Sequence, residues 1–90
     1  MLEGMVRVIN PLGLHARAAA QLVRLAAGFK SEIAFKRIDN SITVNAKSML
    51  SVLTLAASMN TILQLNVTGE DEKGAFEAIC QLFANGFGEI

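Results

Sequence analysis

His15 is the only histidine of the 90-residue chain, and it lies two residues before Arg17. No cysteine or acidic cluster lies near it in the sequence, so we do not expect a metal site here. A neutral imidazole nitrogen can act as a nucleophile. A guanidinium in the same helical turn can pair with phosphate oxygens. These residues therefore place a nucleophile and a counter-charge for an anion within three positions of the chain.

The residues after His15 predict a helix from about His15 or Ala16 to Ala27, because alanine favours helix. The free backbone N–H groups of Ala16 and Arg17 at such a start bind anions, and the helix dipole adds a favourable field. A single histidine at a helix start is more often an ordinary surface or capping residue, and the residues alone leave both interpretations open. Helical spacing places these residues on the core face: Ala19, Leu22, Val23, Ala26 and Phe29.

The rest of the chain predicts an α+β fold of the order β-α-β-β-α-β-α, with an antiparallel sheet that carries its helices on one face. The strands are recognised by alternation of apolar and polar residues. Negative charge at residues 70–72 precedes the last helix, as the helix dipole prefers. The expected elements are a strand at 5–10, a break at 10–13, a strand at 32–37, a turn at 38–41, a short strand around Ile42 and Val44, a helix from near Ser48 to Ser58 or Met59, a strand at 62–68, and a last helix with Phe76, Ile79, Leu82 and Phe83 on its core face.

The second helix is predicted to be apolar on more than one side. One stripe, Val52, Leu55, Ala56 and Met59, is enough to face the core, and a second comprises Met49, Leu50, Leu53 and Ala57. A chain of this length cannot bury a helix all round, so we expect the second stripe to be an exposed patch for partners. The alternative is a helix packed into the core on both sides. Ser48 stands where this helix begins and suits an N-cap.

Composition narrows the class of protein. Lys and Arg together number 8, as do Asp and Glu, so nothing points to nucleic acid as a partner. The single cysteine, Cys80, excludes an internal disulfide, suits a reducing compartment and is expected to be a small core residue. The apolar runs are too short for a membrane span, and residues 1–10 do not read as a signal peptide. We expect one cytoplasmic domain over residues 1–90.

Three segments resemble the HPr family, the histidine phosphocarriers of the phosphoenolpyruvate-dependent phosphotransferase system. The run from Asn10 to Ala20, with Gly-Leu-His-Ala-Arg at its centre, is similar to the family's phosphorylation site. Residues 45–53 look like the segment around its regulatory serine, and residues 67–72 match before the final helix. The resemblance covers essentially the whole chain. It implies an open-faced sandwich with a four-stranded antiparallel sheet in the order 1-4-2-3 and three helices on one face.

The resemblance also implies roles and partners. His15 would be the phosphohistidine, phosphorylated on Nδ1, with Arg17 stabilising the phosphate and Ser48 open to phosphorylation by an HPr serine kinase/phosphorylase. Enzyme I would donate the phosphoryl group and enzyme IIA domains would accept it, with no cofactor, no metal, no nucleic acid and no membrane involved, and with the protein as a monomer. The expected partner-binding residues are Leu14, Ala20, Arg24, Lys47, Met49, Leu50 and Leu53.

Two features depart from the family's usual pattern. Ala18 stands where proline commonly follows the arginine, and alanine is equally tolerated in a first helical turn. Ala18 and residues 82–87 are similar to the nitrogen-related (NPr) branch, so sugar and nitrogen branches both stay open. The hairpin near Asp39 also looks slightly longer than usual. The rival functions are a purely regulatory binding module and a small enzyme using His15, although no second catalytic group or substrate pocket is evident near it.

Overall fold

The computed structural model describes residues 1–89, and its main elements follow the predicted order β-α-β-β-α-β-α. A short 3-10 turn, η1, follows the last helix and is not among the predicted elements. The elements are β1 (Leu2–Arg7), α1 (Ala16–Ala27), β2 (Glu32–Arg37), β3 (Thr43–Asn45), α2 (Met49–Thr54), β4 (Ile62–Thr68), α3 (Glu72–Ala84) and η1 (Gly86–Gly88).

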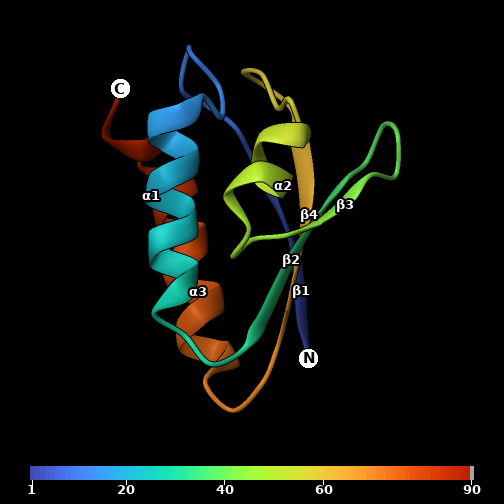
Figure 1. Ribbon diagram of the computed structural model, residues 1–90, viewed down its shortest axis with the longest axis vertical. Helices are drawn as coiled ribbons and strands as arrows, with labels where there is room; N and C mark the ends of the chain where they lie inside the picture. The colour runs from blue at the N-terminus through green and yellow to red at the C-terminus, as the bar shows by residue number, and fades with distance from the viewer. Residues whose placement is uncertain (90) are drawn as a thin grey trace.

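The four strands form one antiparallel sheet in the order β1-β4-β2-β3, which confirms the predicted topology. The central strand β4 pairs with β1 from Leu2↔Val67 to Arg7↔Ile62, and with β2 along its other edge. All three helices lie against the same face of the sheet (Figure 1). The fold is therefore the open-faced α+β sandwich that the sequence predicts.

The core lies between the sheet and the helices. On β4, Leu63, Leu65 and Val67 are fully buried, while the alternate residues Gln64 and Asn66 point to the open face. This alternation follows from the two-residue period of a strand that has one face covered and one facing water. The ring centroids of Phe35 on β2 and Phe83 on α3 are 5.5 Å apart, so these two side chains pack the sheet against the helical layer.

Helix α1 has the predicted bounds, and its core face is the predicted one. Ala19, Leu22 and Ala26 are buried, whereas Arg17 and Arg24 are exposed on the opposite side. Val23 and Phe29 pack against the core while remaining partly exposed. Helix α3 packs beside α1, so the two long helices run side by side over the sheet (Figure 1).

Strand β1 begins and ends three residues before the predicted range of 5–10. Its partner β4 offers a ladder only to residues 2–7, so the regular strand pairing stops at Arg7. Val8 still exchanges backbone hydrogen bonds with the turn before β4, donating to Thr61 O at 3.0 Å and accepting from Asn60 N at 2.6 Å. Val6 and Val8 are both buried, as their spacing predicts.

Helix α2 is much shorter than predicted, because it ends at Thr54 rather than near Ser58 or Met59. Ala56 adopts a left-handed backbone with φ of 48°, which stops the helix. The Arg37 guanidinium donates from Nη1 to the carbonyl oxygens of Leu55 and Ala56, at 2.6 and 3.1 Å, and so holds the terminated end. The predicted stripes past Leu55 are therefore wrong: Ala56 and Met59 are exposed, and Ala57 is buried.

Cys80 lies at the edge of the core rather than inside it. Its side chain is partly buried and packs against the core cluster, next to the fully buried Ile79. This partial burial raises the pKa of the Cys80 thiol. Among residues 1–89, no helix combines the length and the apolar character that crossing a lipid bilayer requires.

Candidate functional site

His15 is the N-cap residue of α1. Its backbone is extended, with φ of −71° and ψ of 176°, and its side chain makes no capping hydrogen bond to the first turn. Ala19 N donates to His15 O at 2.8 Å, so the N–H groups of Ala16, Arg17 and Ala18 lack a partner within the helix. The half-buried imidazole therefore stands beside three free amides at the positive end of the helix dipole.

The loop before His15 is held by specific hydrogen bonds. Asn10 is fully buried, and its side-chain amide donates to Gly13 O at 2.8 Å. Gly13 has φ of 66°, and a Cβ there would lie 2.6 Å from Ala57 O, so glycine is required. Leu14 N then donates to the same Ala57 carbonyl at 2.8 Å. This loop sets where α1 begins and therefore where His15 stands.

Glu89 reaches His15 from the other end of the chain. One carboxylate oxygen, Oε1, accepts a hydrogen bond from Asn10 Nδ2 at 2.8 Å, and the other, Oε2, contacts His15 Nε2. Hydrogen bonds from Asn10 and then His15 hold the pKa of the Glu89 carboxyl below its ordinary value. Glu89 is not among the predicted site residues, because it lies 74 positions along the chain from His15 and no local pattern links the two.

Arg17 lies in the first turn of α1 with a largely exposed side chain, 72% accessible. Its Nη2 stands 3.4 Å from Glu89 Oε2, a long and exposed contact that holds the guanidinium only weakly. The structure therefore brings His15 and Arg17 together, as the sequence predicts, and adds Glu89 between them. Arg17 remains free to turn toward another anion at the helix start.

Ser48 is the N-cap of α2, as predicted. Its hydroxyl accepts a hydrogen bond from Ser51 N at 3.3 Å and donates to Ser51 Oγ at 2.9 Å. The backbone of Ser48 is extended, as is usual for a capping residue. Leu50, which follows in the first turn of α2, is 76% exposed. A phosphate on Ser48 would consequently lie at the border of an exposed apolar surface.

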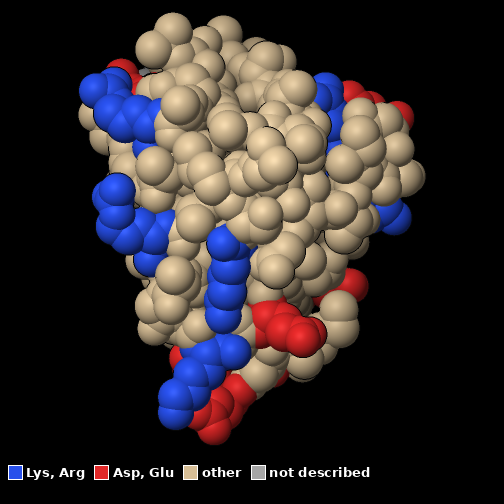
Figure 2. Space-filling view, viewed as in Figure 1, with Lys and Arg blue, Asp and Glu red and all other residues tan. Residues whose placement is uncertain are grey.

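The predicted partner-binding residues divide into three groups. Leu50, Leu53 and Arg24 are exposed, whereas Ala20, Met49 and Lys47 are partly buried. Leu14 is a correction, because it is only 6% exposed and belongs to the core. We define the α1/α2 face as the surface made by Ala20, Arg24, Met49, Leu50 and Leu53. Figure 2 shows an uncharged surface over α2 and the adjoining part of α1, with Lys and Arg side chains along the outer side of α1.

Lys47 points away from the α1/α2 face. Its Nζ donates to Phe29 O at 2.7 Å, just past the end of α1, where a cation also complements the helix dipole. Lys47 thereby ties the segment before α2 to the C-terminal end of α1. The Lys47 ammonium is therefore bound at the C-terminal end of α1, whereas His15 lies at the N-terminal end of that helix.

A shallow depression of about 550 Å³ lies next to Glu89, the residue that contacts His15, although the sequence shows no sign of one. Arg17, Gln21 and Glu89 line it, together with Pro11, Leu12, Phe87 and Gly88. It is wide and open and is not an enclosed substrate cavity, and its lining reaches the site through Arg17 and Glu89 rather than through His15 itself. Within residues 1–89, no group of three or more His, Cys, Asp and Glu side chains is placed to hold a metal ion.

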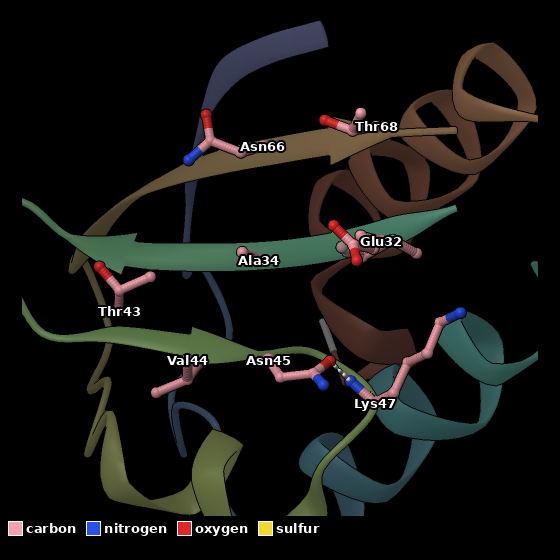
Figure 3. Close-up of a pocket in the computed structure, with 9 residues that line it drawn as sticks. Glu32, Ala34, Thr43, Val44, Asn45, Lys47, Asn66 and Thr68 are labelled. Atoms are coloured by element: carbon pink, nitrogen blue, oxygen red, sulfur yellow. Dashed lines mark hydrogen bonds between the residues drawn. The ribbon is translucent and has the colours of Figure 1, made fainter. Parts of the chain in front are cut away.

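A second depression, of about 400 Å³, lies on the open face of the sheet (Figure 3). The short side chain of Ala34 leaves its centre hollow, between Asn66 on β4 and Asn45 on β3. Lys47, which is bound to Phe29 O, lines the border of this depression, so the depression lies near the C-terminal end of α1. A helix of this length spans about 18 Å, and this depression is therefore separate from the His15 site.

Known proteins are similar to this chain in both sequence and fold. The family model described as the HPr component phosphorylation site of the phosphotransferase system matches residues 2–85. A phosphocarrier protein HPr from Xylella fastidiosa is 44% identical over 89 residues, which cover 99% of this chain and 98% of the relative. The crystal structure of an HPr from Thermoanaerobacter tengcongensis matches with a TM-score of 0.93 at 36% identity, covering 100% of this chain and 99% of that one.

A crystal structure of an HPr dimer from the same organism also matches this chain. Its TM-score is 0.77 at 36% identity, covering 99% of this chain and 100% of that one. The similarity therefore extends to a relative that has been crystallised as a dimer.

Proposed function

The chain belongs to the HPr family of phosphotransferase-system phosphocarriers, and on that premise we propose that His15 accepts a phosphoryl group from phosphorylated enzyme I and passes it to enzyme IIA domains. One observation carries the proposal: the His15 imidazole stands at the start of α1, beside three amides that lack helical partners. Such a helix start attracts the phosphate that a carrier must hold for a time.

The chemistry needs one bond to form and one to break. The lone pair of a His15 ring nitrogen attacks phosphorus, and the bond between phosphorus and the donor's leaving group breaks. The phosphoryl oxygens then lie near the N–H groups of Ala16 and Arg17, and the Arg17 guanidinium turns from Glu89 toward them. The reverse sequence, with an enzyme IIA nucleophile attacking phosphorus, empties the site. No metal or cofactor takes part in this scheme.

The α1/α2 face is the proposed docking surface for both partners. It adjoins His15 through α1, and Leu50 and Leu53 expose apolar area that the core does not use. A carrier must leave each partner quickly, so the interface should be small. A protein that acts as a monomer can present this one face to each partner in turn.

Phosphorylation of Ser48 is proposed as a control on docking. A phosphate there would keep the capping position and suit the dipole of α2. It would also place about two negative charges next to Leu50, where a partner must cover the surface. An HPr serine kinase/phosphorylase would be the enzyme that adds it.

The deciding experiment incubates the protein with enzyme I and phosphoenolpyruvate and follows intact mass. One acid-labile phosphate should appear on the wild-type chain, and none on His15→Ala. Arg17→Ala should fold normally and transfer about 10-fold more slowly, the lower part of the range for a charge-assisted hydrogen bond, because Arg17 is exposed. Equal phosphorylation of the His15→Ala variant would refute the proposal, and partner binding without any phosphate would support a regulatory binding module instead.

A further inference from the structure

The C-terminal segment that carries Glu89 is built in an unusual backbone conformation. Gly86, Phe87 and Gly88 are consecutive and have φ of 58°, 57° and 76°. Phenylalanine rarely adopts this left-handed region, and such strain persists only where the surroundings hold it. The two glycines accept the conformation readily, whereas Phe87 needs compensation from its contacts.

Packing of Phe87 supplies that compensation. Its ring is 3% exposed and meets the ring of Phe83 edge to face, with centroids 5.0 Å apart. Gln21 on α1 donates from Nε2 to Phe87 O at 3.3 Å. The segment is therefore fixed both to α3 and to α1, and it ends with Glu89 directed at the start of α1.

Glu89 is held from two sides where it meets His15. Its side chain is only 11% exposed, and Asn10, itself fully buried, donates to Oε1. Oε2 is thereby presented to the ring nitrogen Nε2 of His15, with Arg17 at 3.4 Å as the nearby cation. The same asparagine also holds the loop at Gly13, so one residue positions both the imidazole and its carboxylate partner.

The contact decides which ring nitrogen can react. An ionised carboxylate only accepts hydrogen bonds, so Nε2 must carry a proton in order to donate to Glu89. In a neutral imidazole this leaves the lone pair on Nδ1, which makes no capping hydrogen bond to α1. Nucleophile and orienting group then stand on opposite sides of one ring, in the same arrangement by which carboxylates orient reactive or ligating histidines.

We infer that Glu89 is a positioning residue for phosphoryl transfer: it holds the proton on His15 Nε2, so that Nδ1 attacks phosphorus and the ring remains a good leaving group afterwards. When the Nδ1–P bond forms, the ring becomes a cation that still carries its Nε2 proton, and Glu89 faces that charge. When an acceptor attacks phosphorus, the Nδ1–P bond breaks and neutral imidazole departs with the same proton. This inference rests on the proposed function of His15.

The test compares Glu89→Ala and Glu89→Gln with the wild type, with Glu77→Ala on the exposed side of α3 as matched control. The first readout uses unphosphorylated, ¹⁵N-labelled protein at low temperature. A hydrogen bond to a carboxylate should make the His15 Nε2 proton visible as a downfield signal by slowing its exchange with water. The signal should be present in the wild type and in Glu77→Ala, weaker in Glu89→Gln, and absent in Glu89→Ala.

The second readout is steady-state phosphorylation by enzyme I. Glu89→Ala should lower kcat by about 10- to 100-fold, the usual effect of losing a group that orients a reactive histidine. KM should change little, because Glu89 is outside the α1/α2 face. Glu89→Gln should lie between the wild type and Glu89→Ala, because its amide oxygen still accepts a hydrogen bond but carries no charge.

The two readouts separate failure of this inference from failure of the proposed function. A Glu89→Ala protein that keeps the Nε2 proton signal, or that loses it with kcat unchanged, overturns the positioning role. Absence of phosphate on wild-type His15 would refute the proposed function while leaving the proton signal measurable. A melting temperature of Glu89→Ala close to that of Glu77→Ala would show that the loss is not one of folding.

Discussion

Replacing Leu50 by alanine should weaken partner binding far more than it weakens the fold. Leu50 is 76% exposed, so only about a quarter of the side chain is buried in the free protein. Full burial of a leucine contributes about 1.5–3 kcal/mol. The buried quarter is therefore worth about 0.5 kcal/mol, which corresponds to a melting temperature lower by about 2–4 °C in a domain of this size.

The exposed three-quarters of Leu50 is what a docked partner would cover. On the same scale, its loss should cost about 1–2 kcal/mol of binding free energy, which is about 5- to 30-fold in Kd. Leu53 is 38% exposed, so Leu53→Ala should weaken partner binding by about 3- to 6-fold. It should lower the stability of the fold more than Leu50→Ala does, because more of Leu53 is buried. Calorimetric titration with enzyme I measures the Kd, and thermal unfolding of each variant measures stability.

Met5→Ala is the matched control for exposed apolar area. Met5 is 59% exposed, but it lies on β1, at the opposite edge of the sheet from β3, against which α2 packs. Its removal should leave the Kd for enzyme I unchanged. The reasoning is refuted if Leu50→Ala binds enzyme I as tightly as the wild type does, or if Met5→Ala weakens binding to the same extent.

Two further predictions concern Ser48 and Asp71. Ser48→Asp keeps a capping acceptor and should raise the KM of enzyme I for this protein without lowering the melting temperature. Ser48→Ala should lose about 1 kcal/mol of stability and transfer phosphate at a nearly normal rate. An unchanged KM in the aspartate variant would leave Ser48 as a helix cap alone. Hydrogen bonds from the Ser31 hydroxyl and the Lys30 amide hold the pKa of Asp71 below its ordinary value of 3.8. The ionised carboxylate therefore stabilises the fold above pH 3.8, and this contribution disappears as the pH falls through the lower pKa of the folded state. Asp71→Asn should therefore melt lower than the wild type at neutral pH, and the gap should close in acid; a gap that is the same at every pH would contradict the assignment.

The elements that the sequence predicts best are those whose signals are local. The ranges of α1, β2 and β4 agree with the structure because each contains its own periodicity, 3.6 residues in α1 and two in the strands. His15 and Arg17 are near each other for the same reason, since they lie two positions apart at the start of one helical turn. The capping role of Ser48 likewise depends only on Ser51, three residues away.

The errors occur where a distant contact overrides the local pattern. Apolar spacing continues past Thr54, but a left-handed Ala56 and the guanidinium of Arg37, from the neighbouring hairpin, end α2 there. Leu14 lies in a loop, where no period assigns a side chain to core or surface. Its backbone bond to Ala57 carries it into the core.

The sequence by itself determines the order of elements, the face that α1 buries and the place of His15 at a helix start, because these depend on interactions within a few positions. The partner of the imidazole could come only from the tertiary structure. Glu89 lies 74 residues from His15 and reaches it through a strained turn anchored by Phe87 and through a hydrogen bond to Asn10. Contacts of this kind leave no periodicity in a sequence, since they form only after both ends of the chain have packed on the same core.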